Sequence, residues 1–215
     1  MINNKLAKEI ASHLLQINAI KLSPQNPFTW ASGIKSPIYC DNRVILSYPT
    51  QRKAVKEALQ ANCKHFGDYD LVAGVATSGI PFATLLSDAT DEPMIYVRSK
   101  PKGHGTQKMT EGKFEPGQKV LVIEDLISTG GSCLKAVENL RADGLEVIGV
   151  LAIFSYNFDE ASENFAKHNC AYHTLSNFPT LLQEAVAAKY IADSDLESIN
   201  KWIKNPKHWL DSAVS

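Results

Sequence analysis

The sequence predicts an α/β fold, a Rossmann-like parallel sheet flanked by helices. Three observations support this prediction. Short strands and helices alternate through the middle of the 215-residue chain. The strands are almost continuously apolar, as in Lys119–Glu124 and Glu146–Phe154, which is typical of parallel strands buried on both faces. Glycine turns connect strand to helix, as at Gly79. In such a sheet, ligands bind at the carboxyl ends of the strands.

The N-terminal part is predicted to begin with a helix over residues 5–17. Its apolar residues share one helical face: Leu6, Ile10, Leu14 and Ile17. Residues 23–49 are punctuated by Pro and Ser, which indicates loops and short extended pieces. A second helix is predicted over Pro49–Leu59, with the proline in its first turn.

The middle of the chain is predicted to supply the sheet. The expected strands are Asp70–Val75, Met94–Arg98, Lys119–Glu124 and Glu146–Phe154, and the expected helices are Ile80–Leu86 and Ser132–Arg141. From about residue 160 the chain is expected to be mainly helical, with breaks at Pro179 and Pro206. Because no repeat, linker or low-complexity tract occurs, we expect one domain over residues 1–215, with its core at about 49–155 and a mainly helical segment at about 156–215.

Composition and charge argue against several classes of protein. A hydrophobic content of 44% and a charged content of 21% are ordinary for a globular protein. The net charge of −1 supplies no basic field for nucleic acid or anionic lipid. No apolar run has the length of a membrane span, and the N-terminus lacks a signal-peptide pattern. We therefore expect a cytoplasmic protein without nucleic-acid or membrane partners.

The cysteines and histidines do not form a recognisable metal site. The four cysteines lie far apart and form no Cys-x-x-Cys pair, so free thiols are expected. His168, Cys170 and His173 lie near one another, but their spacing fits no strong ligand template. No metal ligands among the protein side chains are predicted.

The most informative segment is Val120–Ser132, in which an apolar strand ends in two acids and a hydroxyl- and glycine-rich turn follows. Backbone N–H groups and hydroxyls of the turn can bind a phosphate at a helix N-terminus, and they come from Ser128, Thr129, Gly130, Gly131 and Ser132. Glu124 and Asp125 can accept hydrogen bonds from ribose hydroxyls. The turn lacks the Gly-Lys-Ser/Thr of a Walker A loop. The alternative is a strand–turn–helix corner with incidental acids.

This segment resembles the phosphoribosyl pyrophosphate (PRPP) signature of type I phosphoribosyltransferases. The resemblance implies the fold of that family, with a small N-terminal hood at about 1–48 and a flexible catalytic loop. It implies that Glu124 and Asp125 hold the ribose 2'- and 3'-hydroxyls and that residues 128–132 hold the 5'-phosphate. It also implies Mg2+ as cofactor, bound mainly through PRPP.

A second segment, Phe28–Arg43, resembles the N-terminal signature of orotate phosphoribosyltransferases. Pro37 favours an extended turn, and Tyr39 can pack against a flat acidic pyrimidine. Orotate contacts are accordingly expected at Tyr39, Lys35 and Ser128. An aromatic-anchored surface loop is the alternative interpretation.

Two loops are expected to bind pyrophosphate. Arg98–Gly105 resembles the catalytic loop of orotate phosphoribosyltransferases, which closes over the neighbouring subunit of a homodimer. In it Arg98, Lys102 and His104 match family positions, and Lys100 is a nearby cation. Residues 74–81 resemble the family's pyrophosphate loop, with Thr77 and Ser78 as donors. Taken alone, these segments also fit a solvated charge run and a plain turn.

The chain departs from some family members at three positions. Ala31 and Ser78 stand where some relatives carry a lysine, and Ser-Tyr-Asn-Phe at 155–158 replaces a stretch in which some carry a substrate-contacting arginine. Base recognition is therefore the least defined part of the prediction.

The resemblance implies transfer of ribose 5-phosphate from PRPP to orotate, with Arg98, Lys102, His104 and Asp125 as catalytic residues. A phosphoribosyltransferase for another base, such as a purine, is the nearest alternative. A PRPP-sensing DNA-binding regulator would need an added helix-turn-helix module and a basic face. A fused synthase would need a second barrel of roughly 200 or more residues, for which the chain is too short.

Overall fold

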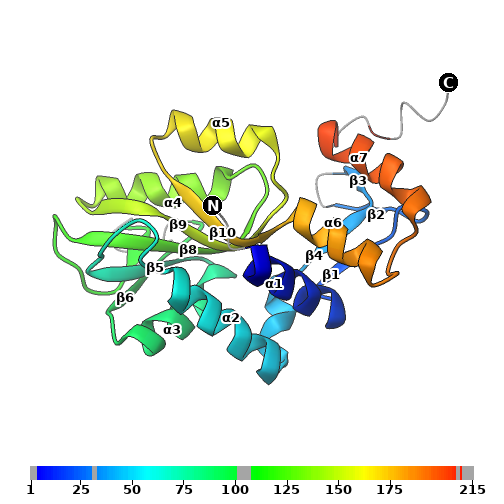
Figure 1. Ribbon diagram of the computed structural model, residues 1–215. Coiled ribbons are helices and arrows are strands. Elements are labelled where there is room, and N and C mark those ends of the chain that lie inside the picture. Colours follow the sequence, from blue (N-terminus) through cyan, green and yellow to red (C-terminus); the bar gives the residue numbers. More distant parts are fainter. Residues whose placement is uncertain (1–3, 31–32, 101–107, 207–208, 210–215) are drawn as a thin grey trace.

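The computed structural model describes residues 4–30, 33–100, 108–206 and 209. Figure 1 shows a central sheet with helices on both faces and a smaller lobe beside it, built from segments near both ends of the chain. The predicted fold class is confirmed: an α/β architecture with a mostly parallel sheet.

The central sheet has six strands in the order β10-β9-β8-β5-β6-β7. Its four predicted strands are present as β5 (Leu71–Val75), β6 (Met94–Val97), β8 (Lys119–Ile127) and β9 (Glu146–Ser155). They run parallel to one another, and β10 (Tyr172–Asn177) continues the parallel sheet at one edge. At the other edge β7 (Thr110–Glu111) is antiparallel to β6.

The sequence does not predict two strands of this sheet, β7 and β10. β7 has only two residues, too few for a periodic pattern. β10 lies in the segment expected to be mainly helical, and its sequence, Tyr-His-Thr-Leu-Ser-Asn, is mostly polar. It is a strand because β9 supplies its backbone partners, from Tyr172↔Val150 to Asn177↔Ser155. Pairing with a buried neighbour outweighs the weak local preference.

Helices cover both faces of the sheet. In Figure 1, α1 (Asn4–Gln16), α2 (Pro49–Asn62) and α3 (Gly79–Thr90) lie on one side, and α4 (Gly131–Ala142) and α5 (Asp159–Lys167) lie on the other. Consecutive β8 residues face opposite cores: Leu121 and Ile123 pack with α1–α3, whereas Val120 and Val122 pack with α4 and α5. This two-sided burial is why Val120–Ile123 is an unbroken apolar run.

The smaller lobe combines N-terminal strands with C-terminal helices. Two short antiparallel pairs form it, β1 (Ile20–Leu22) with β4 (Ile38–Cys40) and β2 (Phe28–Thr29) with β3 (Lys35–Ser36). The 3-10 helix η1 (Asn42–Ser47) leads from β4 to α2, and η2 (Asp193–Asp195) lies between α6 (Phe178–Ala187) and α7 (Leu196–Lys204).

Aromatic packing joins the two ends of the chain in this lobe. Trp202 of α7 is fully buried, with ring centroids 5.8 Å from Trp30 and 5.7 Å from Phe178. Tyr156, directly after β9, lies 5.4 Å from Trp30. The C-terminal helices thus contribute to the core beneath the N-terminal segment.

The expected end of the strand before the acidic pair was wrong. The sequence placed it at Glu124, but β8 continues to Ile127. β5 pairs with β8 only as far as Gly74↔Ile123, whereas β9 pairs with it to Ile127↔Ser155. The two acids therefore belong to the strand, at the point where one of its neighbours has already ended.

Candidate active site

The candidate site lies at the carboxyl ends of β5 and β8. Glu124 and Asp125 stand there beside the turn into α4, and the β5–α3 turn approaches them from the neighbouring strand. Gly79 makes this approach close, because a Cβ on it would stand 2.5 Å from the carbonyl oxygen of Ile123 and 3.5 Å from Cα of Glu124. The predicted ribose and pyrophosphate segments are thus brought together by the sheet.

Replacing Gly79 by alanine is expected to destabilise the protein. The added methyl group would overlap the backbone of β8, which cannot rotate away as a side chain can. We expect a loss of about 1–3 kcal/mol in the free energy of unfolding, measured by urea denaturation. Gly131→Ala is the matched control, since the nearest atom to its added Cβ is 4.0 Å away. Equal effects of the two substitutions would contradict this interpretation.

The first acid of the pair, Glu124, is buried, and the second, Asp125, is half-buried. Glu124 is only 5% exposed, and its Oε1 accepts a hydrogen bond from the N–H of Asp125 at 3.0 Å. Burial raises the pKa of Glu124 well above its usual range, and the neighbouring charge of Asp125 raises it further. Burial also raises the pKa of Asp125. Carboxyl groups held at this cost are suited to a ligand that supplies cations or hydroxyl donors.

Residues 39–43 border the acidic pair. Arg43 Nε lies 2.6 Å from Asp41 Oδ1, and this hydrogen bond lowers the pKa of Asp41. The positive charge of Arg43 also acts to lower the pKa of Asp125, against the effect of burial. Asn42 is fully buried, and its Nδ2 donates to the carbonyl oxygen of Asp125 at 2.7 Å. Sequence reasoning missed Asn42, because nothing local distinguishes it from a loop residue.

The turn after β8 carries the predicted phosphate ligands. Gly130 has a φ of 83°, in the left-handed region, and forms the N-cap of α4. Gly131 and Ser132 are exposed at the start of this helix, whose first N–H groups have no intrahelical acceptor. The backbone of Thr129 is bound to α5, because Asn164 Nδ2 of that helix donates a hydrogen bond to the Thr129 carbonyl oxygen at 3.0 Å. The turn therefore has the form of an anion-binding helix N-terminus.

The remaining predicted ligands lie around this centre. Thr77 is exposed and Ser78 half-buried in the turn between β5 and α3. Arg98 follows β6, with Nη1 3.5 Å from Glu111 Oε1, and Lys100 is exposed two residues further on. Lys102 and His104 lie outside the described residues.

Two of the three predicted base contacts, Tyr39 and Lys35, lie in the small lobe, whereas Ser128 lies in the turn between β8 and α4. Tyr39 of β4 is 40% exposed, and its phenol is among the groups that act on the pKa of Arg43. Lys35 belongs to β3, where its amine donates to Thr29 Oγ1 at 2.7 Å. Tyr156 belongs to residues 155–158, the stretch in which some relatives carry a substrate-contacting arginine. Burial raises the pKa of the Tyr156 phenol, and the charges of Cys40 and Asp125 raise it by smaller amounts.

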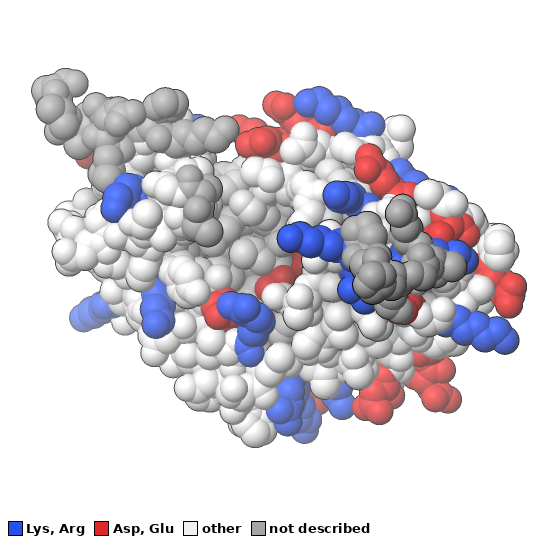
Figure 2. Space-filling view, turned by 180° about the vertical axis from the view of Figure 1, so that it is seen from behind, with Lys and Arg blue, Asp and Glu red and all other residues white. Residues whose placement is uncertain are grey.

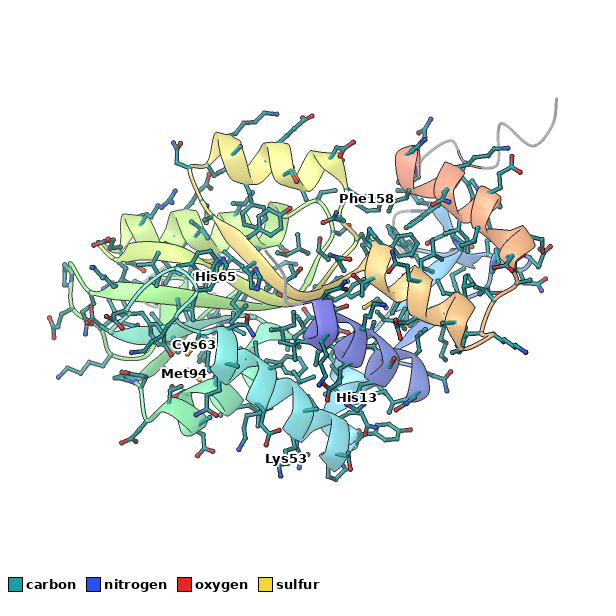
Figure 3. The ribbon with its side chains drawn as sticks, viewed as in Figure 1. His13, Lys53, Cys63, His65, Met94 and Phe158 are labelled. Carbon is teal, nitrogen blue, oxygen red and sulfur yellow. The ribbon has the colours of Figure 1, made fainter. Side chains whose placement is uncertain are left out.

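A cavity of about 450 Å³ opens beside the turn at residues 128–132, called here the phosphate turn after its predicted ligand. It lies between Ser128 and Thr129, the rings of Trp30 and Phe158, and residues 203–206, where α7 ends and the following segment begins. Figure 3 shows Phe158 between α5 and the small lobe. The C-terminal segment, expected from the sequence to be mainly helical, thus forms one wall of this cavity.

The described residues provide no preformed metal cage. No cluster of three or more His, Cys, Asp or Glu side chains is suitably placed among them to bind a metal ion.

Within the described residues, no helix is both long and apolar enough to cross a membrane. The face in Figure 2 mixes Lys and Arg with acidic side chains.

Comparison with known proteins identifies the family of the chain. Residues 45–186 match the phosphoribosyl transferase domain family. The orotate phosphoribosyltransferase of Bacteroides thetaiotaomicron is 51% identical over 205 residues, which are 95% of this chain and 97% of that protein. That of Cytophaga hutchinsonii is 49% identical over 203 residues, 94% of this chain and 97% of that protein.

A solved structure agrees with these sequence relatives. The crystal structure of orotate phosphoribosyltransferase from Aeropyrum pernix superposes with a TM-score of 0.74 at 28% identity, covering 85% of this chain and 99% of that one. Because the family model matches most of the chain and relatives of this similarity cover nearly its whole length, the chain belongs to the orotate phosphoribosyltransferases, within the phosphoribosyltransferase family.

Proposed function

We propose that the protein catalyses the Mg2+-dependent transfer of ribose 5-phosphate from PRPP to orotate, which yields orotidine 5'-phosphate and pyrophosphate for UMP synthesis. The observation that carries the proposal is the adjacency of Glu124 and Asp125 to the turn at residues 128–132. Carboxylates beside an anion site suit a ligand that presents hydroxyl groups and a phosphate together.

The residues around this centre have separate roles in the proposal. Asp125 and Glu124 accept hydrogen bonds from the ribose 2'- and 3'-hydroxyls. The 5'-phosphate is held by Ser128, Thr129, Gly130, Gly131 and Ser132. Thr77 and Ser78 bind pyrophosphate from the β5–α3 turn, and Arg98, Lys100, Lys102 and His104 bind it from the catalytic loop.

Catalysis in this scheme is mainly electrostatic. Breaking the bond between the anomeric carbon and pyrophosphate builds positive charge on the ribose and negative charge on the leaving group. Arg98 and Lys102 neutralise pyrophosphate, His104 donates a hydrogen bond or proton to it, and Asp125 offsets the charge on the ribose. The orotate ring nitrogen attacks from the opposite face, so no covalent enzyme intermediate is required.

The residues present fit Mg2+ bound together with PRPP. Mg2+ prefers oxygen ligands and is usually held by one or two carboxylates plus substrate phosphates. Glu124 is buried and Asp125 half-buried, and both have raised pKa values, so a nearby cation would stabilise their ionised forms. Held mainly through PRPP, with these carboxylates nearby, Mg2+ would supply positive charge to the leaving pyrophosphate.

Orotate recognition in the proposal uses Ser128, Tyr39 and Lys35. Ser128 lies at the turn, and Tyr39 belongs to the segment that contacts Asp125 through Asn42. We further propose a cytoplasmic homodimer in which the catalytic loop closes over the partner's site, a single domain over residues 1–215, and no nucleic-acid or membrane partner.

A spectrophotometric assay of orotate consumption with purified protein, PRPP and Mg2+ tests the function. Adenine, hypoxanthine and uracil are run in parallel. Orotate loss that requires both PRPP and Mg2+, with the other bases inert, is expected. Turnover of another base without turnover of orotate would retain the PRPP site and reject the proposed base. No turnover with any base would reject the proposed activity.

We expect kcat/KM for PRPP to fall as the pH is lowered, and to begin falling at a pH above the pKa range of ordinary carboxyl groups. The pKa values of Glu124 and Asp125 are raised, so the ionised forms that accept hydrogen bonds from ribose are lost as pH falls through these raised values. Initial rates across pH at limiting PRPP measure this fall. A profile that stays flat down to the ordinary Glu value of 4.5 would contradict this assignment.

A further inference from the structure

We propose that Asn42 and Asn164 are positioning residues of the PRPP site, an inference that rests on the function proposed above. Each side chain reaches in from an element outside the β8–α4 segment. Each donates its amide hydrogen to a backbone carbonyl of that segment, Asn42 to Asp125 at 2.7 Å and Asn164 to Thr129 at 3.0 Å. Asn42 orients the carboxylate that binds the ribose, and Asn164 orients the turn that binds the 5'-phosphate.

Asn42 replaces a backbone partner that the sheet no longer supplies. β5 pairs with β8 only as far as Gly74↔Ile123, so Asp125 lies beyond that ladder. There the N–H of Asp125 donates to Glu124 Oε1, and its carbonyl accepts from Asn42. Both backbone groups of Asp125 are therefore held by side chains, and the direction of its carboxylate depends on them.

The burial of Asn42 makes this contact specific. Its side chain is fully buried, and its Oδ1 is 3.5 Å from Cys40 Sγ, so the amide is engaged at both ends. It lies three residues after Tyr39, in the segment proposed to bind the base. Without Asn42 the carbonyl of Asp125 would lack this donor, and the strand end would relax away from the observed position.

Asn164 determines which side of the phosphate turn presents N–H groups. In a trans peptide the C=O of one residue and the N–H of the next point in opposite directions. Because Asn164 holds the carbonyl of Thr129 toward α5, the N–H of Gly130 points away from α5. An outward carbonyl at this place would repel a phosphate, whereas an outward N–H attracts it.

A second contact from α5 supports the same turn. Gly130 lies against the ring of Phe165, so closely that a Cβ would stand 2.7 Å from Cε2. Gly130 also has a φ of 83°, which a glycine adopts without strain. Phe165 and Asn164 are adjacent in α5, so one helix supports both the packing and the peptide orientation of the turn.

The test is calorimetric binding of ribose 5-phosphate and, separately, of pyrophosphate to the full chain with Mg2+. Asn42→Ala and Asn164→Ala are each expected to weaken ribose 5-phosphate binding about tenfold, the effect of a change of about 1.4 kcal/mol. Pyrophosphate affinity should stay within about twofold. Asn62→Ala is the matched control, since Asn62 makes a 2.8 Å side-chain bond to the carbonyl of Ala58 in α2.

A double-mutant cycle separates positioning from loss of structure. In an Asp125→Asn background, Asn42→Ala should lose most of its effect, because the carboxylate through which it acts is gone, whereas Asn164→Ala should retain its effect. Wild-type affinity for ribose 5-phosphate in both single variants would overturn the proposal. So would equal losses for ribose 5-phosphate and pyrophosphate, which would indicate general loosening.

The proposed function is tested separately by the orotate assay on the wild-type protein. If the wild type makes no orotidine 5'-phosphate, the function fails whatever the calorimetry gives. If it does and the single variants bind ribose 5-phosphate normally, only the positioning inference fails.

Discussion

Glu124→Gln is expected to remove most of the activity while stabilising the ligand-free protein. The side chain is 5% exposed, and burial beside Asp125 raises its pKa well above the usual range. Glutamine has nearly the same shape but cannot ionise, so the folded protein no longer carries the cost of a buried carboxylate. For the same reason it cannot supply the negative charge that the proposed site offers to the ribose of PRPP and to Mg2+. We expect kcat/KM for PRPP to fall about 100- to 1,000-fold.

The sign of the stability change depends on pH. A carboxyl group whose pKa is raised on folding stabilises the folded state fully only below its unfolded value, and this contribution is lost as pH rises through the folded pKa. At neutral pH the variant should therefore exceed the wild type by about 1–3 kcal/mol. In a domain of this size each kcal/mol raises Tm by about 2–4 °C. The gain should disappear below the ordinary value of 4.5.

Thermal unfolding across pH, together with initial rates, measures both effects. Glu57→Gln is the control, since Glu57 is a 61% exposed residue of α2 that pairs with Lys53 at 3.8 Å, and neither quantity should change. A Glu124→Gln variant that is less stable at neutral pH would show that the carboxylate is satisfied in the ligand-free protein. Retained activity would remove Glu124 from the PRPP site.

Lys102→Ala is expected to lower kcat about 1,000-fold with little change in PRPP affinity. The resemblance to the catalytic loop suggests that Lys102 meets pyrophosphate as negative charge develops on it. An interaction made mainly in the transition state affects turnover rather than ground-state binding. Single-turnover rates and calorimetric PRPP affinity measure the two quantities separately.

Two comparisons define the outcome for Lys102. Lys53→Ala is the control. The side chain of Lys53, in α2, is 73% exposed, so this variant should behave as the wild type. Figure 3 shows Lys53 on the outer side of that helix. Comparable losses in kcat and in PRPP affinity would mean that Lys102 binds the ground state as strongly as the transition state.

The sequence by itself determined the four strands at the centre of the sheet and the acid- and glycine-rich segment that follows one of them. Both depend on neighbouring residues: apolar runs such as Lys119–Glu124 define strands, and residues 128–132 form the turn that begins a helix. The β5–α3 turn was found for the same reason. These features are encoded within a few residues of each other, so they can be recognised without knowledge of the tertiary structure.

The tertiary structure decided everything that depends on residues distant in the sequence. Asn42 meets Asp125 across 83 positions and Asn164 meets Thr129 across 35, and no local pattern marks either contact. The strand β10 forms because β9 is beside it, although its own residues are mostly polar. Likewise, Trp202 packs against Trp30 in the small lobe. The physical reason is that hydrogen bonds and buried contacts depend on distance in space, and only the folded chain brings these residues together.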